Sequence, residues 1–131
     1  MVATMPVQLN HHIVHVSDKE ASASFYSEML GLPAPKAMGP FLAVQLDNDV
    51  TLDFIDAPDG FTTTHYAFLV SETDFDEIFG RIQERQMPFW PDPMRSAEGE
   101  INTRDGGRGC YFEDPDGHFL EILTRPYGSG S

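Results

Sequence analysis

Apolar and polar positions follow the same order twice along this chain. In the first round, alternating apolar residues predict strands. Ala21, Phe25 and Met29 have helical spacing, and they predict a helix that stops at Gly31. The expected elements are a strand over 9–16, a helix to about residue 30, and strands over 41–46 and 50–55. Ser17 and Glu20 have the S-x-x-E spacing of a capping box, which predicts Ser17 as the N-cap.

The second round begins after the Pro58-Asp59-Gly60 break. Its helix follows Ser71, which has an acidic residue three positions later, and Phe75, Ile78 and Ile82 give it a helical apolar face. The expected elements are a strand over 65–70, that helix, a short extended piece over 88–90, a polar loop over 94–107, and strands over 109–113 and 118–124. The two rounds therefore predict the same module.

Direct overlay of the two rounds supports an internal duplication. Residues 11–18 align with 65–72, and residues 49–55 align with 117–123, both without gaps. We predict an α+β fold of two tandem βαβββ modules whose strands form a curved mixed sheet, a cup, with the helices outside. The expected layout is an N-terminal tail over 1–8, one domain over 9–127 with modules at about 9–58 and 64–125, and a flexible tail over 128–131.

Each closing strand carries one carboxylate on an otherwise apolar face, Asp53 in the first and Glu121 in the second. A lone ionised carboxylate there is costly unless it is paired, hydrogen-bonded or bound to a metal. Each opening strand supplies a histidine at the equivalent position, His11 and His65. Two imidazoles with one or two carboxylates suit Mn²⁺, Fe²⁺, Ni²⁺ or Zn²⁺. The alternative is a satisfied polar core, or a ligand pocket without a metal.

Charge and cysteine content narrow the function classes. The net charge is −13, from 21 acidic and 8 basic residues, so we expect neither a nucleic-acid partner nor an anionic membrane surface. No apolar run reaches the roughly 18 residues of a membrane span. Cys110 is the single cysteine. An intrachain disulfide is therefore excluded, and a cytoplasmic protein is predicted.

Several motifs resemble the vicinal oxygen chelate superfamily, which includes glyoxalase I, fosfomycin-resistance transferases, extradiol dioxygenases and bleomycin-resistance proteins. The resemblance spans about residues 9–125 and is carried by LNH at 9–11, FY at 25–26, LGL at 30–32, THYAF at 64–68 and YFEDPDGHFLE at 111–121. It implies the cup fold and a divalent metal held by His11, His65 and Glu121. It also implies a homodimer, with sites that two subunits can share.

Within the superfamily the chain looks most like the fosfomycin thiol-transferase type, where Tyr111 matches a substrate-contacting tyrosine. It departs from that type at Ile13, which stands in place of a threonine, and over residues 91–107, where a lysine- and serine-rich phosphonate loop is missing. In glyoxalase and epimerase types, the position of Asp53 is a fourth ligand or a nearby base. Because of the departures at Ile13 and over residues 91–107, fosfomycin is not the expected substrate.

The remaining candidates surround the expected metal site. The residues expected to contact substrate are His15, which shares the face of His11, together with Trp90, Tyr111, Arg104 and Arg108. The two arginines lie in or beside a lid-like loop. A hydrogen-bonded structural role is the alternative for His15. Solvated loop charge is the alternative for either arginine.

A free carboxylate, Asp53 or Glu100, would move a proton. His12 is expected to point at the helix layer, His118 to be exposed in a turn and Cys110 to be buried.

The predicted function is a metal-dependent lyase, isomerase or transferase of the small type, acting on a small oxygen-bearing metabolite or drug. One alternative is a non-catalytic drug- or metabolite-binding protein that resembles the bleomycin-resistance relatives. Another is a small Fe(II) extradiol-type dioxygenase.

Overall fold

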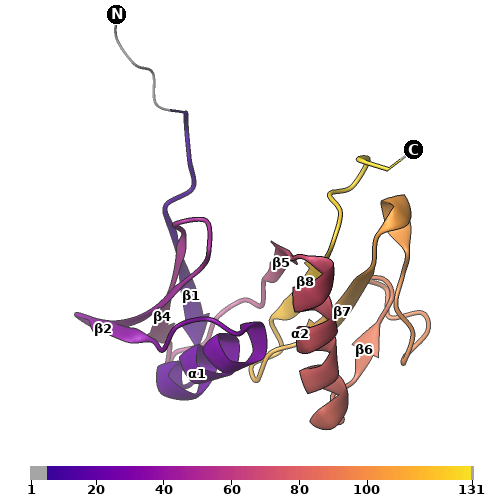
Figure 1. Ribbon diagram of the computed structural model, residues 1–131. Helices are drawn as coiled ribbons and strands as arrows, with labels where there is room; N and C mark the ends of the chain where they lie inside the picture. The colour runs from indigo at the N-terminus through magenta and orange to yellow at the C-terminus, as the bar shows by residue number, and fades with distance from the viewer. Residues whose placement is uncertain (1–5, 131) are drawn as a thin grey trace, which may run out of the picture. The chain divides into compact units, whose positions relative to one another are not determined.

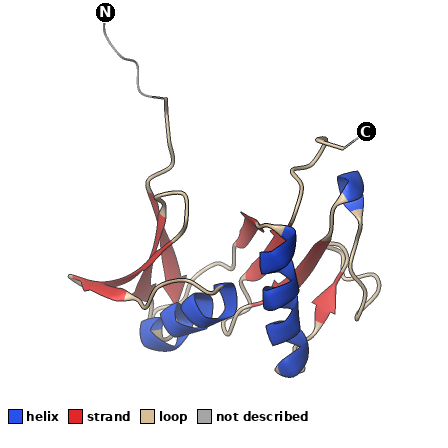
Figure 2. Ribbon diagram, viewed as in Figure 1, coloured by secondary structure: helices blue, strands red, loops and turns tan. Residues whose placement is uncertain are grey.

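The computed structural model describes residues 6–130, and its contacts divide them into two compact units. The first unit holds residues up to 28 together with 32–61, and the second holds 29–31 together with 62 onward. Figure 1 labels the two α-helices and most of the strands, and Figure 2 separates helix from strand by colour.

The first unit contains one mixed sheet of four strands in the order β1-β4-β3-β2. Strand β1 runs parallel to β4, and the other neighbours are antiparallel. Its elements are β1 (His11–Val16), α1 (Lys19–Leu30), β2 (Lys36–Met38), β3 (Phe41–Gln45) and β4 (Thr51–Asp56). The strand β2 had no predicted residue range, because all three of its residues are exposed at the sheet edge and leave no apolar alternation to detect.

The second unit repeats this arrangement with the strand order β5-β8-β7-β6. Strand β5 is parallel to β8, and β8-β7-β6 are antiparallel neighbours. Its elements are β5 (His65–Leu69), α2 (Glu72–Glu84), β6 (Phe89–Trp90), a 3₁₀ turn η1 (Arg104–Gly106), β7 (Gly109–Glu113) and β8 (Phe119–Leu123). The predicted α+β fold with two βαβββ modules is thus confirmed.

Both helices follow a serine with an acidic residue three positions later, but the serine is the N-cap in only one of them. Ser71 caps α2 as predicted, and its hydroxyl accepts the backbone N–H of Asp74 at 3.0 Å. In α1 the prediction was wrong by one position. The Asp18 carboxylate accepts the backbone N–H groups of Glu20 and Ala21, at 3.1 and 3.2 Å. Asp18 directly precedes the first helical residue, so its carboxylate reaches the free N–H groups of the first turn.

Strand alternation places one face of each sheet in a hydrophobic core. Leu52 and Phe54 of β4 are buried, and the Phe54 ring lies 4.8 Å from that of Tyr26 on α1. In the second unit Leu120 and Ile122 are fully buried in the same way. Each fully buried side chain of this size contributes about 1.5–3 kcal/mol through removal of apolar surface from water. The core therefore packs against the face of each closing strand that carries its even-numbered residues. Asp53 and Glu121 lie on the opposite face of their strands.

The expectation that His118 is exposed in its turn was wrong. His118 is 1% exposed, and its Nδ1 accepts the backbone N–H of Thr64 at 3.0 Å. The Asp114 carboxylate also accepts the backbone N–H of His118, so the turn folds back and buries the ring. His12 shares the face of Val14 and Val16, but it lies near the start of β1 and is exposed rather than covered by the helix layer.

The C-terminal segment is held by specific contacts over its described residues. The Asp105 carboxylate accepts the backbone N–H groups of Gly128 and Gly130, both at 3.1 Å. A flexible tail was predicted over 128–131, whereas residues 128–130 lie against the η1 turn (Figure 1). Ser131 and residues 1–5 of the predicted N-terminal tail fall outside the described range. No helix within residues 6–130 is long and apolar enough to span a membrane.

Candidate functional site

His65 and Glu121 form the centre of the candidate site in the second unit. Parallel pairing of β5 with β8 puts Ala67 opposite Glu121, so the side chains of His65 and Glu121 lie on one face of the sheet. The His65 Nε2 atom lies 3.1 Å from the Glu121 Oε1 atom. Glu121 is 1% exposed, whereas the His65 side chain is 47% exposed. The site is therefore a buried carboxylate covered by an accessible imidazole.

The hydrogen-bond partner of the other ring nitrogen determines what His65 offers to Glu121. His65 Nδ1 lies 2.8 Å from the backbone oxygen of Phe119. A carbonyl oxygen only accepts, so Nδ1 must carry the hydrogen. In the neutral imidazole, Nε2 then presents a lone pair to an acceptor-only carboxylate. Either a proton or a metal cation between these two atoms makes the arrangement favourable.

Two tyrosines complete the surroundings of Glu121. The Tyr127 hydroxyl donates to Glu121 Oε2, and the Tyr111 hydroxyl lies 2.7 Å from that of Tyr127. Burial, followed by the hydrogen bond to Glu121, raises the pKa of Tyr127. Both carboxylate oxygens of Glu121 thus have a partner, His65 on one side and Tyr127 on the other. Tyr127 was not predicted, because it follows the last strand where no periodicity marks it.

An aromatic row extends from His65 along the same face. The Tyr111 ring stacks on His65 at a centroid distance of 5.8 Å and on Phe119 at 5.4 Å. Trp90 continues the row at 5.9 Å from Phe119. Phe119 was not predicted as a site residue, although its position two before Glu121 places it on the same face of β8. The row gives the site a flat, apolar side.

Arg95 covers the end of this row and was also not assigned to the site. Its guanidinium carbon lies 4.6 Å from the Trp90 ring centroid and 4.4 Å from that of Phe119. Its charge is paired with Glu113. Cation–π contact of this kind contributes about 0.5–2 kcal/mol. It fixes Arg95 as a lid over two aromatic rings.

The two predicted substrate-contacting arginines lie on opposite sides of the sheet. The Arg104 guanidinium is 5.8 Å from the Tyr127 ring centroid, and a hydrogen bond with Tyr111 is the main cause that raises its pKa. Arg104 therefore belongs to the His65–Glu121 face. Arg108 instead pairs with Glu72 and Asp76 of α2, each at 2.8 Å.

The direction of Arg108 argues against its expected contact with substrate, which stays a prediction. Its guanidinium carbon also lies 4.4 Å from the Phe75 ring centroid, on the helix side of the sheet. Two helix carboxylates and an aromatic face attract it there. Glu100 is exposed in the loop before η1.

In the first unit, Asp53 has the burial of a functional carboxylate. It is 8% exposed, and its Oδ1 atom has no hydrogen-bond partner among the described residues. Its strand neighbours are Ile13 and Ala43, which offer no side-chain donor. A buried, unsatisfied carboxylate oxygen is costly. It is therefore a candidate to accept a proton or a cation.

His11 and His15 occupy the same face of β1, and both are exposed. His11 Nδ1 lies 2.8 Å from the side-chain oxygen of Asn10. Within neither unit do the described residues gather three His, Cys, Asp or Glu side chains suited to a metal. Each unit thus presents part of the predicted ligand set, His65 with Glu121 in one and His11 with Asp53 in the other.

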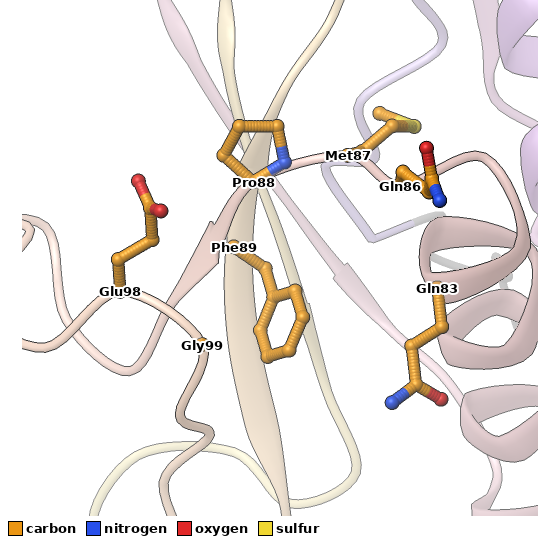
Figure 3. A pocket seen from close by; sticks show the side chains of 7 residues that line it. All are labelled: Gln83, Gln86, Met87, Pro88, Phe89, Glu98 and Gly99. Atoms are coloured by element: carbon orange, nitrogen blue, oxygen red, sulfur yellow. The ribbon is translucent and has the colours of Figure 1, made fainter.

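Cys110 and a shallow pocket lie outside this site. Burial raises the pKa of Cys110 to about 12, so the thiol stays protonated at neutral pH and is a poor nucleophile. A pocket of about 400 Å³ lies between the end of α2, β6 and the following loop (Figure 3). Its lining is Gln83, Gln86, Met87, Pro88, Phe89, Glu98 and Gly99. None of the predicted site residues lines it.

Comparison with known proteins places this geometry in context. The profile of the Glyoxalase/Bleomycin resistance protein/Dioxygenase superfamily matches residues 8–122. The solved structure named "Oxidase ChaP-H2" has 58% sequence identity and a TM-score of 0.94, over 97% of this chain and 100% of that one. "Oxidase ChaP-H1" has 60% identity and a TM-score of 0.92, over 94% and 99%.

A curated relative supports the predicted subgroup at lower identity. "Glutathione transferase FosA" of Serratia marcescens is 33% identical over 87% of this chain and 78% of its own length. The predicted membership of the superfamily is therefore confirmed, and the two oxidases share far more of the sequence than this transferase does. Profile, fold and relatives agree that the chain belongs to the Glyoxalase/Bleomycin resistance protein/Dioxygenase superfamily.

Proposed function

We propose that this protein is a metal-dependent oxidase that acts on a small molecule. The observation that carries the proposal is the 3.1 Å approach of His65 Nε2 to Glu121 Oε1 with Nδ1 bound to a backbone carbonyl. A histidine that ligates a metal commonly donates its other N–H to a carbonyl in this way. The oxidase names of relatives at 58% and 60% identity supply the reaction class.

The donor set favours a redox-active metal. His11, His65 and Glu121 would together offer two imidazoles and one carboxylate, the combination typical of non-haem Fe(II) sites with open positions. When bound, iron supplies the one-electron chemistry that lets dioxygen accept electrons from an organic substrate. Manganese has the same capacity, whereas Zn²⁺ has none. The proposal therefore disfavours Zn²⁺ among the four metals that the sequence left open and favours a redox-active metal such as iron or manganese.

The protein's own residues would bind and orient the substrate. The Tyr127 hydroxyl donates to Glu121 Oε2 and lies 2.7 Å from the Tyr111 hydroxyl, so the Tyr111 oxygen can accept a hydrogen bond from a hydroxyl oxygen on the substrate. Arg104, beside Tyr127, supplies a positive charge for an anionic form of that oxygen. Asp53 has a buried oxygen without a partner in the described structure, which suits a base that removes a substrate proton. The proposal assigns no role to Glu100 or Arg108. Glu100 is exposed in its loop, and Arg108 is paired with α2.

His11 is the ligand that a second copy of the chain would contribute. It lies on an exposed face of β1 together with Ile13, which is 39% exposed, and His15. The nearby Leu9 is 69% exposed. An apolar and imidazole-bearing strand face of this kind suits an interface that is covered in a homodimer. We therefore propose a homodimer in which His11 joins His65 and Glu121 of the other subunit.

The decisive experiment loads the purified protein anaerobically with Fe(II) and measures bound metal and oxygen uptake. We expect one Fe(II) per chain, loss of that metal in H11A and in H65A, and full retention in H12A. His12 is exposed on the same strand but on the opposite face, so H12A is a matched control. A small set of catechols and related phenols would then be screened for oxygen consumption. If H65A retains its metal, the proposed site is wrong.

Thiol transfer is the second candidate, because a glutathione transferase is 33% identical over most of the chain. It predicts loss of free glutathione in the presence of fosfomycin and a divalent metal, with no oxygen uptake. Ile13 and the 91–107 segment depart from the transferase pattern, which ranks this candidate below the oxidase. A drug-binding protein without catalysis would consume neither glutathione nor oxygen.

A further inference from the structure

The C-terminal segment over residues 126–130, which we name the strap, reaches the buried carboxylate of Glu121. The Tyr127 hydroxyl donates to Glu121 Oε2, while Oε1 faces His65 at 3.1 Å. Glu121 is 1% exposed, so these two contacts decide how its oxygens are used. The two oxygens therefore have different partners and different surroundings.

Hydrogen bonds, rather than burial, hold the strap in place. Tyr127 is 55% exposed as a residue, so its ring is only partly buried. The Asp105 carboxylate receives the backbone N–H of Gly128 on Oδ2 and that of Gly130 on Oδ1, both at 3.1 Å. Within the strap, the N–H of Ser129 donates to the Pro126 oxygen at 3.1 Å. Both oxygens of Asp105 thus anchor the segment that carries Tyr127.

The anchor itself occupies a backbone conformation that asparagine and glycine adopt more readily. Asp105 has φ 57° and ψ 23°, in the left-handed region. Residues with a side chain adopt this region less readily than glycine. The two hydrogen bonds to the strap offset that disadvantage and use the carboxylate in the orientation that the turn imposes. The η1 turn therefore presents a preformed anchor for the strap.

We propose that Tyr127 is a positioning residue for Glu121, held by the Asp105 anchor. It occupies Oε2, so Glu121 offers a single oxygen, Oε1, to a cation shared with His65. This inference rests on the proposed metal site and adds to it the number of carboxylate oxygens that the metal receives. Without the Tyr127 hydroxyl, Oε2 is free to rotate toward the cation or to bind water. The coordination geometry then changes even where the ligand residues are intact.

The test compares Mn²⁺ binding by Y127F with that of the unmodified full-length protein. Mn²⁺ serves as the probe because its electron paramagnetic resonance spectrum reports the ligand geometry directly. We expect Y127F to bind Mn²⁺ about 10-fold more weakly or worse, because substitution of a residue that hydrogen-bonds to a metal ligand commonly has an effect of this size. We also expect the spectrum to change. Y66F is the matched control. It removes a phenol oxygen from the opposite face of β5, and we expect affinity and spectrum to stay unchanged.

A second variant tests the anchor and guards against a local folding defect. D105A removes both acceptors of the strap but leaves Tyr127 present, and we expect the same spectral change with a smaller loss of affinity. D105N keeps one oxygen acceptor and should recover part of that loss. Circular dichroism and thermal unfolding of each variant establish that the fold is retained.

The outcomes separate this proposal from the metal site on which it rests. In one outcome, H65A abolishes Mn²⁺ binding, while Y127F has the spectrum of the unmodified protein and a Mn²⁺ affinity within twofold of it. The positioning role of Tyr127 is then wrong, and the metal site stands. If H65A and the unmodified protein bind Mn²⁺ equally, both proposals fail. If Y127F and D105A change the spectrum while Y66F does not, the proposal is supported.

Discussion

The backbone oxygen of Phe119 lies 2.8 Å from Nδ1 of His65, and this contact decides which ring nitrogen faces Glu121. Phe119 is directly opposite His65 in the parallel β5–β8 pairing. The same register that aligns the strands therefore sets the tautomer of the histidine. It leaves Nε2 and Glu121 Oε1, two acceptors, facing each other at 3.1 Å.

Glu121→Gln is expected to separate metal binding from stability. The amide removes the charge that attracts a cation, so we expect Fe(II) or Mn²⁺ affinity to fall at least 10-fold. The same amide can donate N–H to His65 Nε2, which satisfies the facing acceptors without a proton or a metal. Without metal, the unfolding temperature of E121Q should therefore match or exceed that of the unmodified protein. Thermal unfolding with and without metal measures both effects.

Glu113→Gln is the matched control for that substitution. The Glu113 side chain is 40% exposed, and its carboxylate pairs with Arg95 rather than with His65. Metal affinity should be unchanged in E113Q. A clear loss of stability in metal-free E121Q, or unchanged metal affinity, would contradict the interpretation of the two facing acceptors.

Cys110 is expected to resist alkylation in the folded protein. Its side chain is fully buried, and burial raises the pKa of the thiol to about 12. The reactive thiolate is therefore scarce at pH 8. Mass spectrometry after iodoacetamide treatment should show a largely unmodified folded protein and a single addition in denaturant. Modification of the folded protein as fast as of the unfolded chain would be inconsistent with the buried position.

The pKa of Cys110 also affects stability at high pH. A thiol whose folded pKa is raised above its ordinary 9.0 binds its proton more tightly in the folded state. The resulting stabilisation is complete below about pH 9 and is lost as pH rises from 9 toward 12. Cys110→Ala should remove this part of the pH dependence. The free energy of unfolding of C110A, measured at pH 8 and 10, should fall less between these values than that of the unmodified protein.

His118→Ala is expected to destabilise the second unit although the residue follows a polar turn. The ring is buried, and its Nδ1 accepts the N–H of Thr64 at 3.0 Å. Loss of that acceptor leaves a donor unsatisfied, at a cost of about 1–3 kcal/mol. His12→Ala, at an exposed position, should change the free energy of unfolding by less than about 0.5 kcal/mol. Urea unfolding that shows equal effects for H118A and H12A would contradict the buried role.

These cases show which parts of the fold and the site sequence patterns could predict. Alternation along 118–124 puts Glu121 on the face of its strand that does not carry the core residues Leu120 and Ile122. The duplication identifies His65 as the histidine of the neighbouring strand on that face. Periodicity and capping signals were therefore enough to predict both modules and the His65–Glu121 part of the candidate site. These patterns depend on neighbours in sequence, and strand pairing converts them directly into neighbours in space.

The contacts that sequence patterns missed involve residues whose surroundings come from distant segments. His118 is buried because its turn folds back on Thr64, 54 positions earlier. Arg108 turns to α2 because Glu72 and Asp76 lie there. Tyr127 enters the site because Asp105 anchors the strap. No local pattern encodes these contacts, so only the folded structure reveals them.

Arg95 gives the last prediction, because it covers the single tryptophan of the chain. Its guanidinium carbon lies 4.6 Å from the Trp90 ring centroid, and Trp90 is 8% exposed. Arg95→Ala removes this cover and should shift the fluorescence emission of Trp90 to longer wavelength, since water gains access to the indole. Arg104→Ala is the matched control, because Arg104 lies against Tyr127 instead, and its emission should be unchanged. An R95A spectrum identical to that of R104A would show that Arg95 does not shield the aromatic row in solution.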